Sequence, residues 1–166
     1  GNIYTTGFFG DTADFDPGAG ILNLTSAGDS DVFISKLNSS GNLLWAKSMG
    51  GANAEYGLGI AVDSSGNVYT TGAFRGTADF DPGAGIYNLS NAGLEDIFVS
   101  KLDGSGNFVW AKSMSGVDDE LANSIAVDSS GNVYTTGYFG GSMDFDPGAG
   151  IINLTSAGAS DIFISK

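Results

Sequence analysis

The sequence predicts an all-β protein built as an array of repeated four-stranded antiparallel units. The first observation is a period: the motif Gly-Asn-(Ile/Val)-Tyr-Thr-Thr-Gly begins at Gly1, Gly66 and Gly131, a spacing of 65 residues. The second is composition, because 27 glycines and 11% aromatic residues indicate many tight turns between short strands. Helical periodicity is absent throughout. A unit of this length cannot bury its apolar face alone, so we expect like units to stack.

The period divides the chain into repeats at residues 1–65 and 66–130 and a partial third repeat at 131–166. When the strands of each unit are counted from the innermost outwards, the first unit is expected to lack its inner strand and the last unit its outer strand. The array is therefore expected to be incomplete, with about two and a half repeats. Free strand edges invite pairing, so the expected partners are other repeats of the same protein or other copies of the chain.

Within the second repeat, β-branched and aromatic residues indicate four strands. We expect these strands at residues 68–74, 96–102, 107–114 and 121–127. The connection 75–85 contains Pro82 and three glycines and is expected to be a loop that holds a short extended piece at 78–80. Residues 86–89 are expected to add a minor strand to this long connection.

The strand that leads into each new repeat has one face made of small residues. Gly57, Gly59 and Ala61 alternate with branched apolar residues. This alternation is typical of a strand whose backbone is crowded on one side, such as the innermost strand of a propeller blade. Four antiparallel strands with a crowded inner strand predict an array of β-propeller-like blades.

Two connections share one turn chemistry. Residues 63–67 and 103–107 both read Asp-x-Ser-Gly-Asn, in which the first side chain accepts hydrogen bonds from nearby backbone and glycine takes a positive φ, so both are predicted to be short β-hairpins. The first repeat has Asn38 where the second has Asp103. Because an amide replaces a carboxylate there, we interpret Asp63, Asp103 and Asp128 as turn formers rather than ligands.

Residues 63–72, 96–102 and 106–112 resemble the bacterial SBBP-type β-propeller repeat. The Asp-x-x-Gly-Asn-x-Tyr turn is similar, more distantly, to NHL-type propellers. The resemblance covers essentially the whole chain and recurs in every copy. It implies a bacterial protein that is secreted or attached to the cell surface, often large and multidomain, with no established catalytic residues to carry over.

Charge and composition exclude several classes of function. The chain has 19 acidic and 6 basic side chains and a net charge of −13, which repels the phosphates of nucleic acid and of anionic membranes. No segment approaches the ~18 consecutive apolar residues of a membrane span, so membrane insertion is not expected. Histidine and cysteine are both absent, so this chain cannot supply a Ser-His-Asp or Cys-His constellation. We therefore expect a protein that is not an enzyme.

The motif Asp-Phe-Asp-Pro-Gly-Ala-Gly occurs three times and places two carboxylates on the same side of an extended segment in each copy, where they could share one cation only if the loop curls at the proline. Oxygen ligands of this kind suit a hard cation, so calcium is the candidate cofactor. The candidate metal ligands are Asp14, Asp16, Asp79, Asp81, Asp144 and Asp146. The alternative is that each aspartate caps its own turn before the proline. In either case Phe15, Phe80 and Phe145 should point into the core.

A second acidic cluster lies in the loops that lead into the inner strands. Glu55 and Glu120 occupy equivalent positions, and Asp118 and Asp119 adjoin the second of them. Propeller loops commonly line a ligand-binding face, so these side chains are candidates for contact with a glycan or a protein. The alternative is a solvated acidic loop. The tryptophans at 45 and 110 lie within alternating strands, which favours packing between blades over sugar stacking.

Three functions follow from these observations. The first is a non-catalytic extracellular or cell-surface propeller segment that serves in binding, adhesion or structure, with calcium as a stabilising ion. The second is a self-assembling surface or fibre subunit that pairs through its open blade edges. The third is a fragment of a carbohydrate-active propeller enzyme, which would need a cleft holding two carboxylates.

Overall fold

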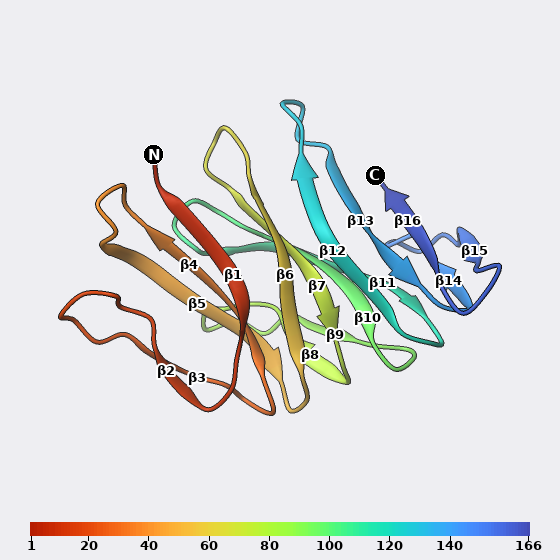
Figure 1. The fold of residues 1–166 in the computed structure, drawn as a ribbon, viewed down its shortest axis with the longest axis horizontal. Helices are drawn as coiled ribbons and strands as arrows, with labels where there is room; N and C mark the ends of the chain where they lie inside the picture. The colour runs from red at the N-terminus through yellow and green to blue at the C-terminus, as the bar shows by residue number, and fades with distance from the viewer.

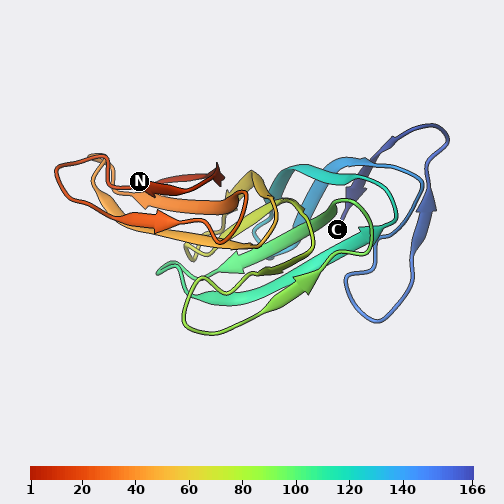
Figure 2. The same cartoon turned by 90° about the horizontal axis from the view of Figure 1, so that it is seen from below.

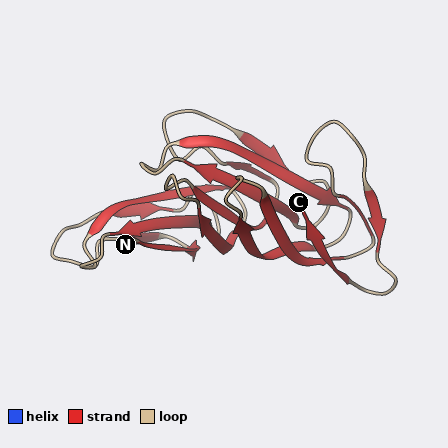
Figure 3. Ribbon diagram, turned by 90° about the horizontal axis from the view of Figure 1, so that it is seen from above, coloured by secondary structure: helices blue, strands red, loops and turns tan.

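The computed structural model describes residues 1–166 and contains strands, turns and loops but no helix (Figure 3). The strands are β1 (Ile3–Phe9), β2 (Thr12–Asp14), β3 (Asn23–Thr25), β4 (Asp31–Leu37), β5 (Leu43–Gly51), β6 (Glu55–Val62), β7 (Val68–Phe74), β8 (Thr77–Asp79), β9 (Asn88–Ser90), β10 (Asp96–Leu102), β11 (Phe108–Gly116), β12 (Glu120–Val127), β13 (Val133–Phe139), β14 (Ser142–Asp144), β15 (Asn153–Thr155) and β16 (Asp161–Ser165). No helix is present that could cross a membrane.

Three antiparallel blades follow one another along the long axis of the molecule (Figures 1 and 2). The middle blade is complete, with strand order β6-β7-β10-β11 from the inside outwards. The first blade has β1, β4 and β5, and the third has β12, β13 and β16. The all-β, propeller-like prediction is confirmed. The first blade contains no strand inside β1, and the third contains no strand outside β16.

The predicted strands of the second repeat agree closely with the structure. Residues 68–74 and 96–102 are β7 and β10, and the other two predicted strands differ from β11 and β12 by one or two residues at their ends. The expected crowding of the inner strand is also present. A Cβ added at Gly57 would lie 2.5 Å from Thr6 Oγ1, and one added at Gly59 would lie 3.1 Å from Ser124 Cα. Inner strand β6 therefore approaches β1 of the first blade and the inner strand β12 of the third so closely that small residues are needed on this face.

In the second and third repeats the long connection forms a hairpin that crosses to the preceding blade. Strands β8 and β9 pair with each other, and β8 adds to the outer strand of the first blade, with Gly50 opposite Asp79 and Gly51 opposite Ala78. Strands β14 and β15 join β11 in the same way. Strands β2 and β3 pair only with each other. The sequence predicted two short extended segments in this connection. It did not predict that the hairpin, called the hairpin strap below, pairs with the preceding blade and so links neighbouring blades.

The hydrophobic core lies between blades rather than within them. One cluster joins Val32, Ile34 and Met49 of the first blade to Phe80 and Phe98 of the second. A second cluster of nine buried residues joins the second blade to the third. Stacking therefore supplies the buried apolar area that a single twisted sheet lacks, as expected for a repeat array.

Candidate functional site

The aspartates of the Asp-x-Ser-Gly-Asn turns are fully engaged in their own hairpins. Asp128 Oδ1 accepts hydrogen bonds from the backbone N–H groups of Ser130 and Asn132, both at 2.9 Å, and its Oδ2 accepts one from Asn132 Nδ2 at 2.7 Å. The side-chain and backbone hydrogen bonds from Asn132 lower the pKa of Asp128 to about 2. Asn38 accepts the same two backbone bonds in the first repeat, so the interpretation as turn formers agrees with the structure.

The aspartates of the Asp-Phe-Asp-Pro loops also accept hydrogen bonds from backbone N–H groups, and these bonds close a longer loop. Asp14 Oδ1 accepts hydrogen bonds from the N–H groups of Asp16 at 3.0 Å and Leu22 at 2.8 Å, and Asp16 Oδ1 accepts one from Gly18 at 2.8 Å. The second and third copies repeat these bonds at Asp79, Asp81, Asp144 and Asp146. Each pair of carboxylates thus closes its own loop.

This geometry favours turn capping over a preformed calcium site. Calcium takes six to eight oxygen ligands, whereas no group of three or more acidic side chains gathers in a position to hold a metal ion. In each loop, the Oδ1 atom of each of the two carboxylates already accepts a backbone N–H bond. Calcium binding at these loops stays a prediction, to be decided by melting experiments.

We expect the thermal unfolding midpoint to be the same in millimolar calcium and in excess chelator, because the hydrogen bonds that close the loops need no ion. Tryptophan fluorescence would follow the transition. A midpoint that rises with calcium, and does so less in the variants Asp16→Asn and Asp81→Asn, would show that the loops bind the metal, since a ligand of the folded state stabilises it by mass action.

The phenylalanine of each loop packs into the blade, as predicted. Phe80 lies 5.5 Å from Phe74 and 4.9 Å from Phe98 between ring centroids. The other two copies form the same trios. Trp45 packs between blades, where its Nε1 donates to the carbonyl oxygen of Gly104 in the next blade at 3.3 Å. These aromatic side chains are structural and form no exposed sugar platform.

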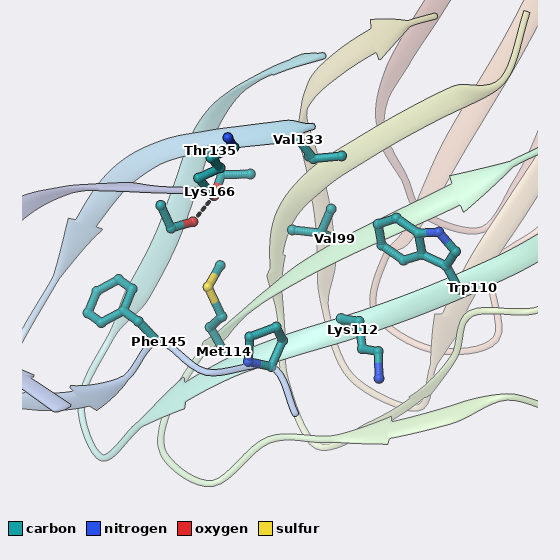
Figure 4. Close-up of a pocket in the computed structure, with 10 residues that line it drawn as sticks. Val99, Trp110, Lys112, Met114, Val133, Thr135, Phe145 and Lys166 are labelled. Carbon is teal, nitrogen blue, oxygen red and sulfur yellow. Dashed lines mark hydrogen bonds between the residues drawn. The ribbon is translucent and has the colours of Figure 1, made fainter. Parts of the chain in front are cut away.

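A cavity of about 130 Å³ lies at the second blade junction and is lined by Val99, Trp110, Lys112 and Phe145 among others (Figure 4). At the first junction the turn that contains Gly104 lies over the equivalent tryptophan, and Lys36 Nζ donates to the Gly104 carbonyl at 2.7 Å. No such turn lies over Trp110. The cavity is thus an uncovered groove between blades, and no carboxylate lines it.

The structure separates the four acidic residues of the second predicted cluster. Asp118 and Asp119 lie exposed in the loop, as expected of ligand-binding or solvated side chains. Glu55 and Glu120, in contrast, are completely buried. They begin the inner strands β6 and β12 and point into the blade junctions, so they cannot touch a glycan or protein on the loop surface. Ligand binding stays a prediction for Asp118 and Asp119.

Each buried glutamate faces a buried aspartate of the preceding blade. Asp31, at the start of β4, is 4% exposed and lies beside Glu55, and Asp96, at the start of β10, is 0% exposed and lies beside Glu120. Sequence reasoning missed the two aspartates. The available signal was that Asp31, Asp96 and Asp161 recur at the first position of a strand, directly before three apolar residues.

Burial dominates the electrostatics of these pairs, because desolvation disfavours the charged carboxylate. It raises the pKa of Glu55 to about 7, and the negative charges of Asp31 and Asp29 add to this effect. Burial, followed by the charge of Asp96, raises the pKa of Glu120 to about 8. Burial also raises the pKa of Asp31.

Comparisons with known proteins point to the same architecture. A family model described as a β-propeller repeat (SBBP) matches residues 44–73 and 118–138. The chain is similar to the regulatory protein FlaEY of Caulobacter vibrioides, with 33% identity over 138 residues that cover 81% of this chain and 14% of that protein. It is also similar to an uncharacterized WD repeat-containing protein of Acanthamoeba polyphaga mimivirus, with 32% identity over 111 residues, 58% of this chain and 8% of that protein. The chain thus spans a small part of the length of either relative.

Proposed function

We propose that this chain, in which a β-propeller repeat (SBBP) model matches residues 44–73 and 118–138, is a non-catalytic module of a stack of blades, with a binding, adhesion or structural role outside the bacterial cell. Two observations support the absence of catalysis. The paired carboxyls are buried in the blade junctions and offer no open cleft to a substrate. The groove at the second blade junction contains no carboxylate. A larger hollow on the first blade, of about 280 Å³, is lined by Asp14 and Asp16, but Oδ1 of each of these carboxylates accepts a backbone N–H bond within its own loop. Glycoside chemistry would need a pair of free carboxyls in an open cleft.

The observation that supports the stacking role is the exposure of apolar side chains on the outward face of the third blade. Ile97 of β10 is 0% exposed because the third blade packs over it, whereas its equivalent in β16, Ile162, is 84% exposed. Ile164 is 80% exposed, and its equivalent Val99 is buried. The same repeat position is thus a core residue wherever another blade covers it. This face is suited to a further blade, supplied by the same protein or by another copy of the chain.

Light scattering over a range of protein concentrations tests this role. We expect the wild-type chain to self-associate as concentration rises, most strongly in added salt that screens the charge of −13. The double variant Ile162→Lys/Ile164→Lys should remain monomeric, because two buried charges at the interface would be costly.

Ile86 provides a matched control. It is 78% exposed, but it lies in the connection between β8 and β9 and not on a blade face. The variant Ile86→Lys makes the same replacement of an exposed isoleucine by lysine, at one position instead of two, so it should associate like the wild type. A wild-type chain that stays monomeric at every concentration and salt would contradict stacking of separate copies through this face and exclude the fibre-subunit alternative.

A further inference from the structure

The four buried carboxyls form two equivalent pairs, each placed where one blade meets the next. Glu55 and Glu120 begin the inner strands of the second and third blades. Their backbone N–H groups donate to the carbonyls of Ser30 at 2.8 Å and Glu95 at 3.0 Å. These bonds belong to short parallel bridges between blades, Ser30 with Ala54 and Glu95 with Asp119. The pairs therefore lie at the seams that hold the stack together.

The carboxyls of each pair are close together. A Cβ added at Gly50 would overlap the carboxyl of Asp31 and would also lie 2.7 Å from Glu55 Oε2, so both side chains crowd the same point. Glu120 lies within hydrogen-bonding reach of the Asp96 carboxyl. Two ionised carboxylates at such a distance repel strongly in a region without water.

The surroundings provide one clear backbone donor to each of three of the four carboxyls. Asp31 Oδ1 accepts a bond from the Ala27 N–H at 3.1 Å, Asp96 Oδ2 accepts one from the Ala92 N–H at 2.9 Å and Glu55 Oε2 accepts one from the Gly51 N–H at 2.7 Å. Four other buried oxygens have no hydrogen-bond partner, namely Glu55 Oε1, Asp96 Oδ1 and both oxygens of Glu120. Buried oxygens without donors are costly. A proton on one carboxyl of each pair would turn an acceptor into the donor that its neighbour lacks.

No positive charge relieves the pairs. The charged group that faces Glu120 is Asp96 on β10, with the backbone N–H groups of Gly116 and Asp118 also near its carboxyl, and the charged groups that face Glu55 are Asp31 on β4 and Asp29 before it. The structure contains one ion pair, between Arg75 and Glu95. Arg75 is thereby engaged outside both carboxyl pairs.

We propose that each blade junction is closed by a carboxylic acid and a carboxylate that share one proton, Asp31 with Glu55 and Asp96 with Glu120, so that acid tightens the stack and alkali loosens it. The step is a plain acid–base equilibrium: hydroxide removes the shared proton as water and leaves two buried like charges. Each junction is therefore a proton-binding site built into the repeat.

The direction of the pH dependence follows from the glutamates. Their pKa values in the folded chain are about 7 and 8, above the ordinary value of 4.5, so the folded chain binds more protons than the unfolded chain between about pH 4.5 and 8. Stability is fully present below this window and is lost as pH rises through it. The turn carboxylates act in the opposite direction, since the pKa of Asp128 is lowered from 3.8, and their contribution is lost below about pH 4.

The test measures the thermal midpoint of the full chain from pH 5 to 9 with the variants Glu55→Gln, Glu120→Gln and the double variant. A glutamine amide donates a hydrogen bond at every pH, so it imitates the protonated acid. We expect the wild-type midpoint to fall as the pH rises from 5 to about 8 and to level off above pH 8. Each single variant should remove roughly half of that fall and the double variant nearly all of it, because the junctions are separate sites. Two protein concentrations separate this effect from association through the third blade.

Asp161 gives a matched control for charge. It occupies the repeat position of Asp96 but is exposed, and no glutamate of the chain faces it. Asp161→Asn should keep the wild-type pH dependence, whereas Asp96→Asn should weaken it, although both remove one negative charge. Equal pH dependence in the wild type and the double glutamine variant would overturn the proposal.

Two further measurements keep the proposal testable if a variant folds poorly. The infrared spectrum of the wild type at pH 6 should contain a carbonyl band of protonated carboxylic acid that disappears by pH 9, and absence of the band would overturn the proposal. The second measurement is the thermal midpoint at pH 8 with millimolar calcium. If calcium raises the midpoint of the wild type but not of Glu120→Gln, the pair holds a cation in place of the proton, and the proposal is wrong.

Discussion

Replacing Phe80 by alanine is expected to destabilise the chain by about 3 to 5 kcal/mol, the usual cost of removing a buried aromatic ring. Phe80 is 0% exposed and packs against the rings of Phe74 and Phe98 at the first blade junction. Its loss would leave a cavity between two blades that the hairpin strap holds at a fixed spacing. Urea unfolding followed by tryptophan fluorescence measures the loss.

The same substitution at Phe15 is the matched control. Phe15 occupies the equivalent position in the first repeat and also contacts two rings, Phe9 at 5.1 Å and Phe33 at 4.9 Å, but it is only half-buried because no blade precedes it. Phe15→Ala should therefore cost much less than Phe80→Ala. Equal losses at the two positions would contradict the assignment of the core to the blade junctions.

The strands and tight turns were predictable because their signals are local. The β-branched and aromatic residues of 68–74 and 96–102 gave the bounds of β7 and β10, and Asp-x-Ser-Gly-Asn gave the hairpin turns. The strap formed by β8 and β9 was not predictable in the same way. Its pairing partner is Gly50 to Gly51 of the preceding blade, and that contact depends on how blades are placed in space.

The candidate sites were also predictable only where their contacts are local. Asp63 and Asp128 were correctly interpreted as turn formers, because every group they bind lies within six residues. Glu55 and Glu120 were taken for loop residues, because acidic side chains are usually solvated. Their burial arises from a second blade that covers them, and their aspartate partners lie 24 residues earlier in the chain. Only the stacked structure brings these groups together.

Substituting Gly72 by alanine should be as severe as the loss of a buried aromatic ring, although it adds a single methyl group. Gly72 lies opposite Gly57 where β7 pairs with the inner strand β6. A Cβ at Gly72 would overlap the backbone carbonyl oxygen of Tyr56, and backbone that is held in a sheet cannot rotate away as a side chain can. The inner strand would have to separate from its neighbour, so we expect a loss of about 3 kcal/mol or more, at the upper end for overpacking.

The variant Gly7→Ala is the control that distinguishes overlap with the inner strand from a general intolerance of alanine in the strand. It occupies the same repeat position in β1, where no inner strand lies alongside, and the nearest atom to an added Cβ is Phe33 Cε1 at 2.6 Å. An aromatic ring in a half-buried setting can move aside to relieve this contact, whereas the Tyr56 carbonyl cannot. Gly7→Ala should therefore unfold at a urea concentration close to that of the wild type and Gly72→Ala far below it. If both variants lose the same stability, the cost comes from the β-strand itself, and close approach of the inner strand is not its cause.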